Sequence, residues 1–194
     1  MDLLWIEGEL VVAGPDTRAY VSSSEAGVQF AAIRFAPGTA AGFLGVPARE
    51  LLDQQVPLAD LWSLGRSRRL ADRVGRAAHP APGLEEAAVA LFDEPPDRLI
   101  GQVVHGLSQG VAIPALASAV GLSERQLHRR SLHAFGYGPK MLDRVLRMNR
   151  ALANARTGLS LASVATQSGY ADQAHLTREI KALTGIPPRA LLAS

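Results

Sequence analysis

Two kinds of hydrophobic pattern divide the chain. In its first third, short apolar runs rich in β-branched residues, LLWIE, ELVVAG and VQFAAIRF, are separated by Gly-Pro and Ser-Ser-Ser-Glu. This pattern predicts short β-strands joined by turns. From Asp97 onward the apolar residues recur at helical spacing, and no run has the pattern of a strand. We therefore expect an α+β first half followed by an all-α second half.

Helices are also expected within the first half. FAPG ends the last predicted strand, and TAAGFLGVPARELL predicts a helix interrupted near Pro47. VPLADLW and the basic stretch RSRRLADRVGRAA follow as predicted helices. HPAPG, residues 79–83, predicts a break between helices, and DEPPD, residues 93–97, predicts the domain boundary. The expected domains are residues 1–96 and 97–194.

The second half contains one pattern twice. The pattern is a small residue, a Gly four positions later and an apolar residue six or seven positions beyond it: Ala117, Gly121 and Leu127, then Ala165, Gly169 and Leu176. It is typical of a helix-turn-helix, where the small residue lets two helices approach and Gly takes the turn. Both copies end on Gly-x-x-Pro, in AFGYGP and LTGIPP. Two copies in the same order are stronger evidence than a single match.

A helix is predicted between the copies, over residues 139–156, PKMLDRVLRMNRALANAR. Pro139 suits a first helical turn. The apolar face consists of Leu142, Val145, Leu146 and Leu152, and the basic residues around it are Lys140, Arg144, Arg147 and Arg150. About 16 helical residues at 1.5 Å each span roughly 24 Å. Such a rod could hold two recognition helices about one turn of DNA apart, roughly 34 Å, so that both enter successive major grooves.

These residues resemble a known family. GYADQAHLTREIKALTGIPP, residues 169–188, and GLSERQLHRRSLHAFGYGPKMLDRVLRMNRAL, residues 121–152, are similar to the DNA-binding domain of the AraC/XylS family of bacterial transcription regulators. The resemblance covers about residues 97–192 and includes the turn Gly-Tyr-x-Asp-x-x-His. It implies a cytoplasmic, sequence-specific regulator that reads two adjacent major grooves of double-stranded DNA with two recognition helices.

The first half resembles the reduced cupin-like domain that precedes this DNA-binding domain in some members. AGP, IRFAPGTAAGFLGVPARELLD and VPLADLW carry this match, which runs to the first residue, so we expect either an incomplete barrel or a chain that starts late. The resemblance implies a sensor or dimerisation domain, with a small-molecule effector, RNA polymerase or a second copy as further candidate partners. Core packing is the favoured use of four aromatic residues in this half, and the alternative is an apolar effector site between them: Trp5, Tyr20, Phe30 and Phe35.

The chain departs from the family pattern in the second helix of each unit. Where relatives usually have Phe, it has Ser131 in the first copy and Ile180 in the second, and Leu176 replaces another common Phe. Ile and Leu keep their sites apolar, whereas losing a buried aromatic costs about 3 to 5 kcal/mol if nothing fills the space. Leu132 or Phe135 is expected to repack around Ser131. Without that repacking the first unit would be the softer one.

The candidate DNA contacts lie on the second helix of each unit. Phosphate contacts supply affinity, whereas base contacts supply specificity, with Arg pairing to guanine and Gln to adenine. The resemblance places these residues toward the bases: Arg125, His128, Arg129, Gln173, His175 and Arg178. Those expected to cap a helix or meet phosphate are Ser123, Lys140, Asp172, Thr177 and Lys181. For each of them the alternative is an ordinary exposed residue.

The distribution of charge supports this division. Residues 1–98 carry nine Arg and no Lys against fourteen acidic residues, a net of −5. Residues 99–194 carry nine Arg and two Lys against four acidic residues, a net of +7. A basic half attached to an acidic half suggests that only the second half binds a polyanion such as nucleic acid. A solvated helical surface is the alternative explanation.

Other functions find less support. The chain has no Cys, which excludes thiolate metal sites and the methyl-accepting thiol of DNA-repair relatives, and no G-x-S-x-G, Walker or HExxH motif is present. All five His follow the predicted strands, so a cupin metal centre would lack imidazole ligands. His128 and His133 are five apart and do not share a helix face. We expect no enzyme, metal or cofactor; the remaining alternative is a helical protein-interaction module.

Overall fold

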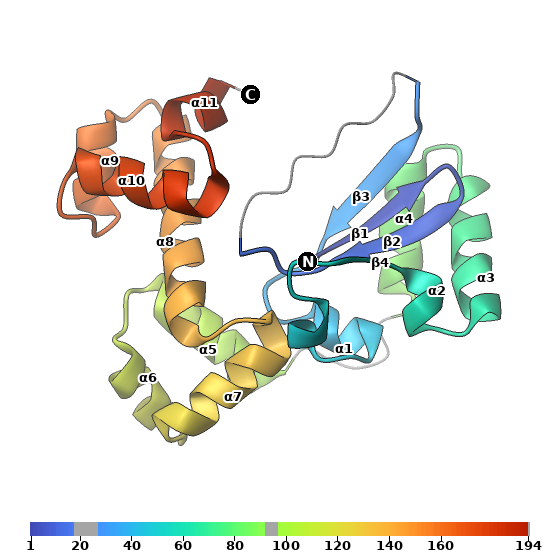
Figure 1. Cartoon of the computed structure of the whole chain (residues 1–194), viewed down its shortest axis with the longest axis horizontal. Coiled ribbons are helices and arrows are strands. Elements are labelled where there is room, and N and C mark those ends of the chain that lie inside the picture. The colour runs from blue at the N-terminus through green and yellow to red at the C-terminus, as the bar shows by residue number, and fades with distance from the viewer. Residues whose placement is uncertain (18–26, 92–96, 194) are drawn as a thin grey trace.

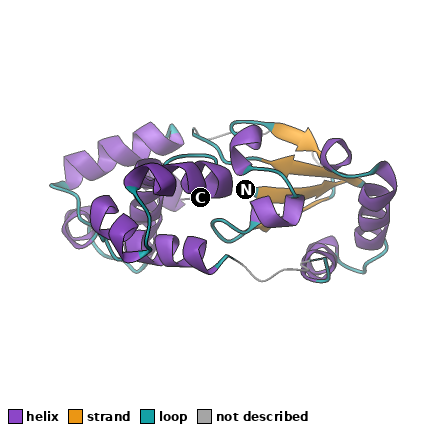
Figure 2. Ribbon diagram, turned by 90° about the horizontal axis from the view of Figure 1, so that it is seen from below, coloured by secondary structure: helices purple, strands orange, loops and turns teal. Residues whose placement is uncertain are grey.

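The computed structural model describes residues 1–17, 27–91 and 97–193. A small antiparallel sheet with helices around it is followed by an all-helical second half, which confirms the predicted fold class. In Figure 1 the helical half occupies the left of the molecule and the sheet with its helices the right. Figure 2 shows the same separation from below.

The sheet has four strands in the order β3-β1-β2-β4. The strands are β1 (Asp2–Ile6), β2 (Glu9–Ala13), β3 (Phe30–Arg34) and β4 (Gln55–Pro57). Glu7 and Gly8 both have positive φ, 46° and 97°, so they form the tight turn that joins β1 to β2. The first three strands confirm the predicted ones. The fourth was not predicted, because QVP is too short to show alternation and only its pairing with β2 makes it a strand.

The described residues of the first half also form the helices α1 (Ala40–Leu44), the 3₁₀ helix η1 (Ala48–Leu51), α2 (Leu58–Leu61), α3 (Leu64–Gly75) and α4 (Pro80–Val89). The gap between α1 and η1 confirms the predicted interruption near Pro47. The predicted break between helices is confirmed, but it covers residues 76–79 rather than 79–83, because α3 ends at Gly75 and α4 begins at Pro80. Pro is tolerated in the first turn of a helix, because the N–H that it lacks would have no hydrogen-bond partner within the helix. His79 belongs to this break, as the extended N-cap residue of α4.

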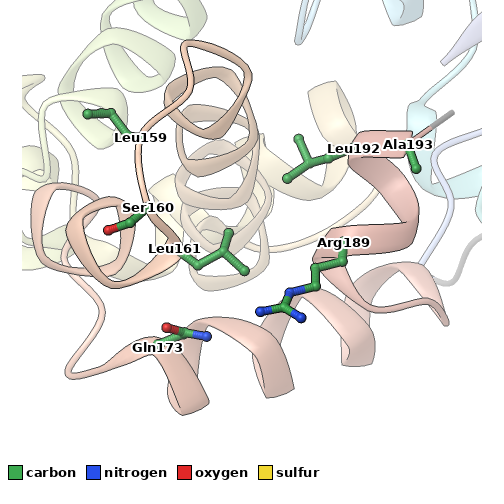
Figure 3. Close-up of a pocket in the computed structure, with 7 residues that line it drawn as sticks. All are labelled: Leu159, Ser160, Leu161, Gln173, Arg189, Leu192 and Ala193. Atoms are coloured by element: carbon green, nitrogen blue, oxygen red, sulfur yellow. The ribbon is translucent and has the colours of Figure 1, made fainter.

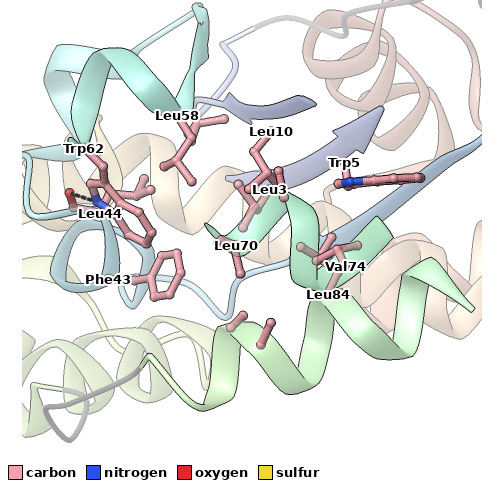
Figure 4. Close-up of a cluster of buried hydrophobic side chains, with 14 of the residues drawn as sticks. Leu3, Trp5, Leu10, Phe43, Leu44, Leu58, Trp62, Leu70, Val74 and Leu84 are labelled. Atoms are coloured by element: carbon pink, nitrogen blue, oxygen red, sulfur yellow. Dashed lines mark hydrogen bonds between the residues drawn. The ribbon is translucent and has the colours of Figure 1, made fainter. Parts of the chain in front are cut away.

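One apolar core lies between the sheet and its helices, and Figure 4 shows its larger side chains. Leu3 and Val12 of the sheet, together with Leu58, are 0% exposed. Core packing is confirmed for Trp5 and Phe35, whereas Phe30 is 65% exposed. Tyr20 lies outside the described residues. The described aromatics therefore do not enclose the effector site considered from the sequence.

The second half contains the helices α5 (Arg98–Ser108), α6 (Ile113–Ala119), α7 (Glu124–Phe135), α8 (Pro139–Arg156), α9 (Leu161–Gln167), α10 (Gln173–Thr184) and α11 (Pro188–Ala193). Two separate cores serve α5–α7 and α9–α11, and both draw residues from α8. The predicted connecting helix is confirmed; its 18 residues span about 27 Å. No helix in residues 1–17, 27–91 or 97–193 is long and apolar enough to cross a membrane.

The two halves touch through α1 and η1 of the first and α7 of the second. Gly38 lies so close to the second half that a Cβ there would be 2.3 Å from Cγ2 of Ile100 and 2.9 Å from Cε1 of Phe135. A Cβ on Gly136 would be 2.4 Å from Cγ of Pro15. These contacts seat the first half against the C-terminal end of α7. The boundary predicted in DEPPD falls on residues 93–96, which lie outside the described residues, so the domain division stays a prediction.

Candidate nucleic-acid interface

The two predicted helix-turn-helix units have the same turn. In the first unit the backbone N–H of Leu122 donates to the carbonyl oxygen of Ala117 at 2.9 Å, and in the second the N–H of Tyr170 donates to Ala165 at 2.9 Å. Both Ala residues are buried, at 2% and 0% exposure, which lets α6 approach α7 and α9 approach α10. The small-residue and Gly spacing predicted from the sequence is confirmed as two such turns.

The predicted N-caps are also confirmed. The backbone N–H of Gln126 donates to Oγ of Ser123 at 3.3 Å, and Oε1 of Gln126 accepts from the N–H of Ser123 at 2.8 Å, which completes a capping box on α7. On α10, Oδ1 of Asp172 accepts from the N–H of His175 at 2.6 Å. Each cap satisfies a donor that the helix leaves unpaired and fixes the first residue of the helix.

Once the caps are aligned, the two second helices share one register. Leu127 and Leu176 are both the fourth helical residue and both are 0% exposed. The extra residue of the second copy therefore lies in the turn, ahead of Asp172. Arg129 and Arg178 are both the sixth helical residue, and both are exposed. The two helices thus present a guanidinium group from the same position.

His175 has a structural role at the start of α10. Its Nδ1 accepts a hydrogen bond from the backbone N–H of Ala171 at 3.3 Å, and its ring meets Tyr170 edge-on, with 5.4 Å between centroids. It occupies the third helical position, as Gln126 does in α7, and like Gln126 it bonds back to the turn. Its Nδ1 is thereby occupied, so only Nε2 is free for the predicted base contact.

Most of the other predicted contact residues are exposed: Ser123, Arg125, His128, Arg129, Lys140, Asp172, Gln173, Arg178 and Lys181. Besides the caps and His175, two further predicted residues contact other parts of the protein. The ring of His128 lies against Gly138, where a Cβ would be 2.6 Å from its Cε1. The half-buried Thr177 donates its hydroxyl to the carbonyl oxygen of Gln173 at 2.8 Å. Contact of these residues with DNA stays a prediction.

Two arginines of α8, Arg144 and Arg147, interact with other residues of the protein. Nε of Arg144 donates to Oε1 of Glu179 at 2.7 Å, and Nη2 of Arg147 lies 3.6 Å from the same oxygen. The guanidinium of Arg147 also stacks over the Tyr170 ring, 4.9 Å from its centroid. The hydrogen bond from Arg144 is the main cause that lowers the pKa of Glu179, which therefore stays ionised. Two of the positive charges in the second half therefore pair with Glu179 and fix α10 to α8.

Arg150 connects the two units. Its guanidinium donates to the carbonyl oxygen of Ser108, at the end of α5, and to that of Ser168, just after α9, at 3.4 Å for the second. Asn154, one turn further along α8, lies 3.5 Å from the Ser168 hydroxyl. The sequence suggested only that Arg150 was one of several basic residues on α8. Its role depends on two carbonyl groups brought together by the fold.

Arg189 is a candidate that sequence reasoning missed. It lies on α11, beyond the Gly-Ile-Pro-Pro stop, and lines a hollow of about 460 Å³ together with Gln173 at the start of α10. In Figure 3 its side chain extends from α11 toward α10. Arg189 makes no ion pair among the described residues. No pattern within α10 could have indicated it, because α11 is a separate helix.

Ser131 lies on the buried face of α7. Ser131 is 0% exposed, and Phe135, four residues later, is buried in the core of the first unit at 4% exposure; repacking around Ser131 stays a prediction. The Ser131 hydroxyl has no hydrogen-bond partner within the described residues.

Across residues 1–17, 27–91 and 97–193, no group of three or more His, Asp or Glu is placed to hold a metal ion.

Comparison with known proteins agrees with this geometry. Residues 116–194 match the family model of a helix-turn-helix domain, and residues 1–57 match that of a domain of unknown function, DUF6597. The helix-turn-helix match supports a DNA-binding transcription regulator of the AraC type. Curated proteins and solved structures gave no match.

Proposed function

We propose that the protein is a sequence-specific transcription regulator that reads two adjacent major grooves of duplex DNA, one with α7 and one with α10. The observation that carries the proposal is the shared register of these helices, each capped and each with Arg at the sixth position. Arg150 and the Glu179 ion pairs hold both units on α8, so their separation is fixed. The protein is not an enzyme in this proposal.

The roles within the interface follow from exposure and side-chain chemistry. Arg125, Arg129, Gln173 and Arg178 contact bases, because Arg and Gln pair bidentately with guanine and adenine. Lys140, Lys181 and Arg189 are exposed cations without ion pairs among the described residues, and they contact phosphate. His128, His175 and Thr177 contribute less in this proposal, since each already packs or bonds within the protein.

Random-library DNA selection with the full chain tests the proposal. Two groove contacts should yield a site with two half-sites one turn of DNA apart. Affinity for the selected site should fall steeply with salt, with a log-log slope near −5 for about six phosphate contacts. A single half-site would mean that only one unit reads DNA. Salt-independent affinity, or no enriched sequence, would favour a protein-interaction module.

A further inference from the structure

The second helices of the two units differ on the face that points away from their cores. The buried fourth and eighth residues are Leu127 and Ser131 in α7, and Leu176 and Ile180 in α10. Successive residues of a helix turn by about 100°, so the second and sixth residues lie on the opposite face. In both helices the residues at these two positions are exposed. We call this the outward face of each helix.

The caps allow the two helices to be compared position by position. Oγ of Ser123 accepts from the N–H of Gln126 at 3.3 Å, and Oδ1 of Asp172 accepts from the N–H of His175 at 2.6 Å. Each cap therefore holds the first turn, which contains the second helical residue. In helix-turn-helix domains the N-terminal residues of this helix contact base edges in the major groove. A difference at the second position is thus a difference in base contact.

In α7 both outward positions hold arginine. Arg125 is the second helical residue and Arg129 the sixth, and neither makes an ion pair among the described residues. The next residue, Arg130, is engaged by contrast, since its Nη1 lies 3.9 Å from Oδ2 of Asp97. The planar guanidinium groups of the two outward arginines are therefore free to donate to O6 and N7 of guanine.

The two free guanidinium groups are spaced to reach nearby base pairs. Four residues of helix rise about 6 Å, and base pairs are about 3.4 Å apart along each strand. Two arginines one turn apart on a helix that lies along the groove therefore reach bases about two steps apart. Because arginine pairs best with guanine, α7 fits a half-site with two guanines at that spacing.

The outward face of α10 holds only one arginine. Its sixth residue is Arg178, which has no ion pair among the described residues, but its second residue is Ala174. The methyl side chain of alanine neither donates nor accepts a hydrogen bond, so it cannot pair with guanine. In the major groove an alanine methyl group packs instead on the C5-methyl group of thymine. The outward face of α10 therefore fits one guanine and one thymine.

We propose that the two half-sites of the DNA differ in composition. The half-site under α7 carries two guanines about two base pairs apart, read by Arg125 and Arg129. The half-site under α10 carries a thymine, packed on Ala174, and a guanine, read by Arg178. A site with unlike halves has a direction, so each chain binds it in one orientation. This inference rests on the proposed function, because both helices must enter major grooves.

Random-library selection with the full chain and three variants tests the inference. The wild-type motif should contain the two unlike half-sites. Arg125→Ala should remove the preference for one guanine, and the half-site that changes is the one under α7. Ala174→Arg copies the outward face of α7 onto α10, so it should replace the thymine of the other half-site by guanine, with a preference of about fivefold or more.

Ala182→Arg, the third variant, is the matched control. Ala182 is an exposed alanine of the same helix, about two turns beyond Ala174. The variant adds the same charge to α10, so it should strengthen binding to all DNA without changing the motif. The same change of motif as in Ala174→Arg would assign the effect to charge alone and overturn the role of Ala174. Thermal unfolding of each variant shows whether it is folded.

Replacing the selected thymine by deoxyuridine tests the methyl contact directly. The replacement removes only the C5-methyl group, so the wild type should bind about fourfold more weakly, as expected for one buried carbon group. Ala174→Gly should bind the thymine and deoxyuridine sites equally, because it has no methyl group to pack. Equal weakening of both proteins, or no weakening of the wild type, would overturn the contact with Ala174.

The outcomes of the selection separate this inference from the proposed function. Two half-sites of the same composition, or an Ala174→Arg motif identical to that of the wild type, would overturn the inference and leave reading of two grooves standing. A single half-site, or no enriched sequence, would overturn the proposed function and the inference with it.

Discussion

The two helix-turn-helix units differ at a buried position of their second helices. Ser131 occupies the eighth position of α7, where α10 has Ile180, and its hydroxyl is buried with no partner among the described residues. A buried polar group without a hydrogen bond costs free energy that an apolar group of similar size would not. At the start of the same helix, Ser123 uses its hydroxyl fully as a cap. The two serines therefore affect the stability of α7 in opposite directions.

Ser131→Ala should raise the free energy of unfolding by about 1 kcal/mol, because it removes an unsatisfied hydroxyl and little volume. Ser123→Ala, the control on the same helix, should lower it by about 1 kcal/mol through loss of the cap. Denaturant unfolding measures both. A destabilised Ser131→Ala variant would show that the hydroxyl has a partner in solution, such as a buried water.

Two candidate DNA contacts on α10, Arg178 and Lys181, are expected to have different roles. Arg178 and Lys181 are both exposed on α10, three positions apart. Arg178→Ala should reduce the preference for the selected site over random DNA by about 1 to 3 kcal/mol, since a bidentate base contact is lost. Lys181→Ala should weaken binding to both DNAs alike and lower the salt slope by about 1. Equal losses on both DNAs for the two variants would contradict these roles.

Among the elements, α8 determines how the two units are placed. Each unit has its own apolar core, and both cores include residues of α8, so both units pack on this one helix. The polar contacts of α8 add to that constraint: Arg150 bonds to the ends of α5 and α9, and Arg144 and Arg147 pair with Glu179 of α10. These contacts are partly buried, where ion pairs are less screened than on the surface.

Glu179→Gln should lower the free energy of unfolding by about 1 to 3 kcal/mol at pH 7, because two guanidinium groups lose their anion. The folded-state pKa of Glu179 is lowered, so its contribution is present above the ordinary Glu pKa of about 4.3. That contribution is lost as pH falls through the lower pKa of the folded state. Denaturant unfolding at pH 7 and pH 3 should therefore show a difference that shrinks with acidification.

Glu124→Gln is the control, since Glu124 makes no ion pair among the described residues. It should change stability by less than about 1 kcal/mol, the size of a helix-dipole effect. A pH-independent loss in Glu179→Gln would mean that the side chain contributes by packing rather than by charge.

For the whole molecule, the contact between the halves joins the sheet domain to α7, the second helix of the first unit. The first half packs on α7 through α1 and η1, and Gly38 and Gly136 mark the closest approaches. Both glycines have positive φ, 86° and 82°. A side chain at either position would meet both backbone strain and a neighbour from the other half. A structural change in the first half would therefore act directly on the first helix-turn-helix unit.

Gly38→Ala should lower the free energy of unfolding by about 2 to 5 kcal/mol, since backbone strain adds to a clash with Ile100 and Phe135. Gly8→Ala provides the matched control: Gly8 has a φ of 97°, but a Cβ there meets nothing within 4 Å. It should lose only about 1 to 2 kcal/mol from backbone strain. Equal losses in denaturant unfolding would mean that the contact between the halves contributes no stability.

The sequence alone determined the local structure of the second half. Caps, Gly turns and apolar spacing act over a few residues, so α7, α8 and α10 and their first residues could be predicted from Ser123, Pro139 and Asp172. In the first half, β4 and the first residue of α4 could not be predicted from the sequence. A three-residue strand is defined only by its pairing with another strand, and a Pro can either begin a helix or interrupt one.

Only the tertiary structure decided which polar residues are free. Arg144, Arg147, Arg150 and His175 resemble the exposed basic residues in sequence, yet their partners come from other helices or from the turn. Local patterns specify elements because their causes are short-range; charge pairing depends on distances between segments far apart in the chain.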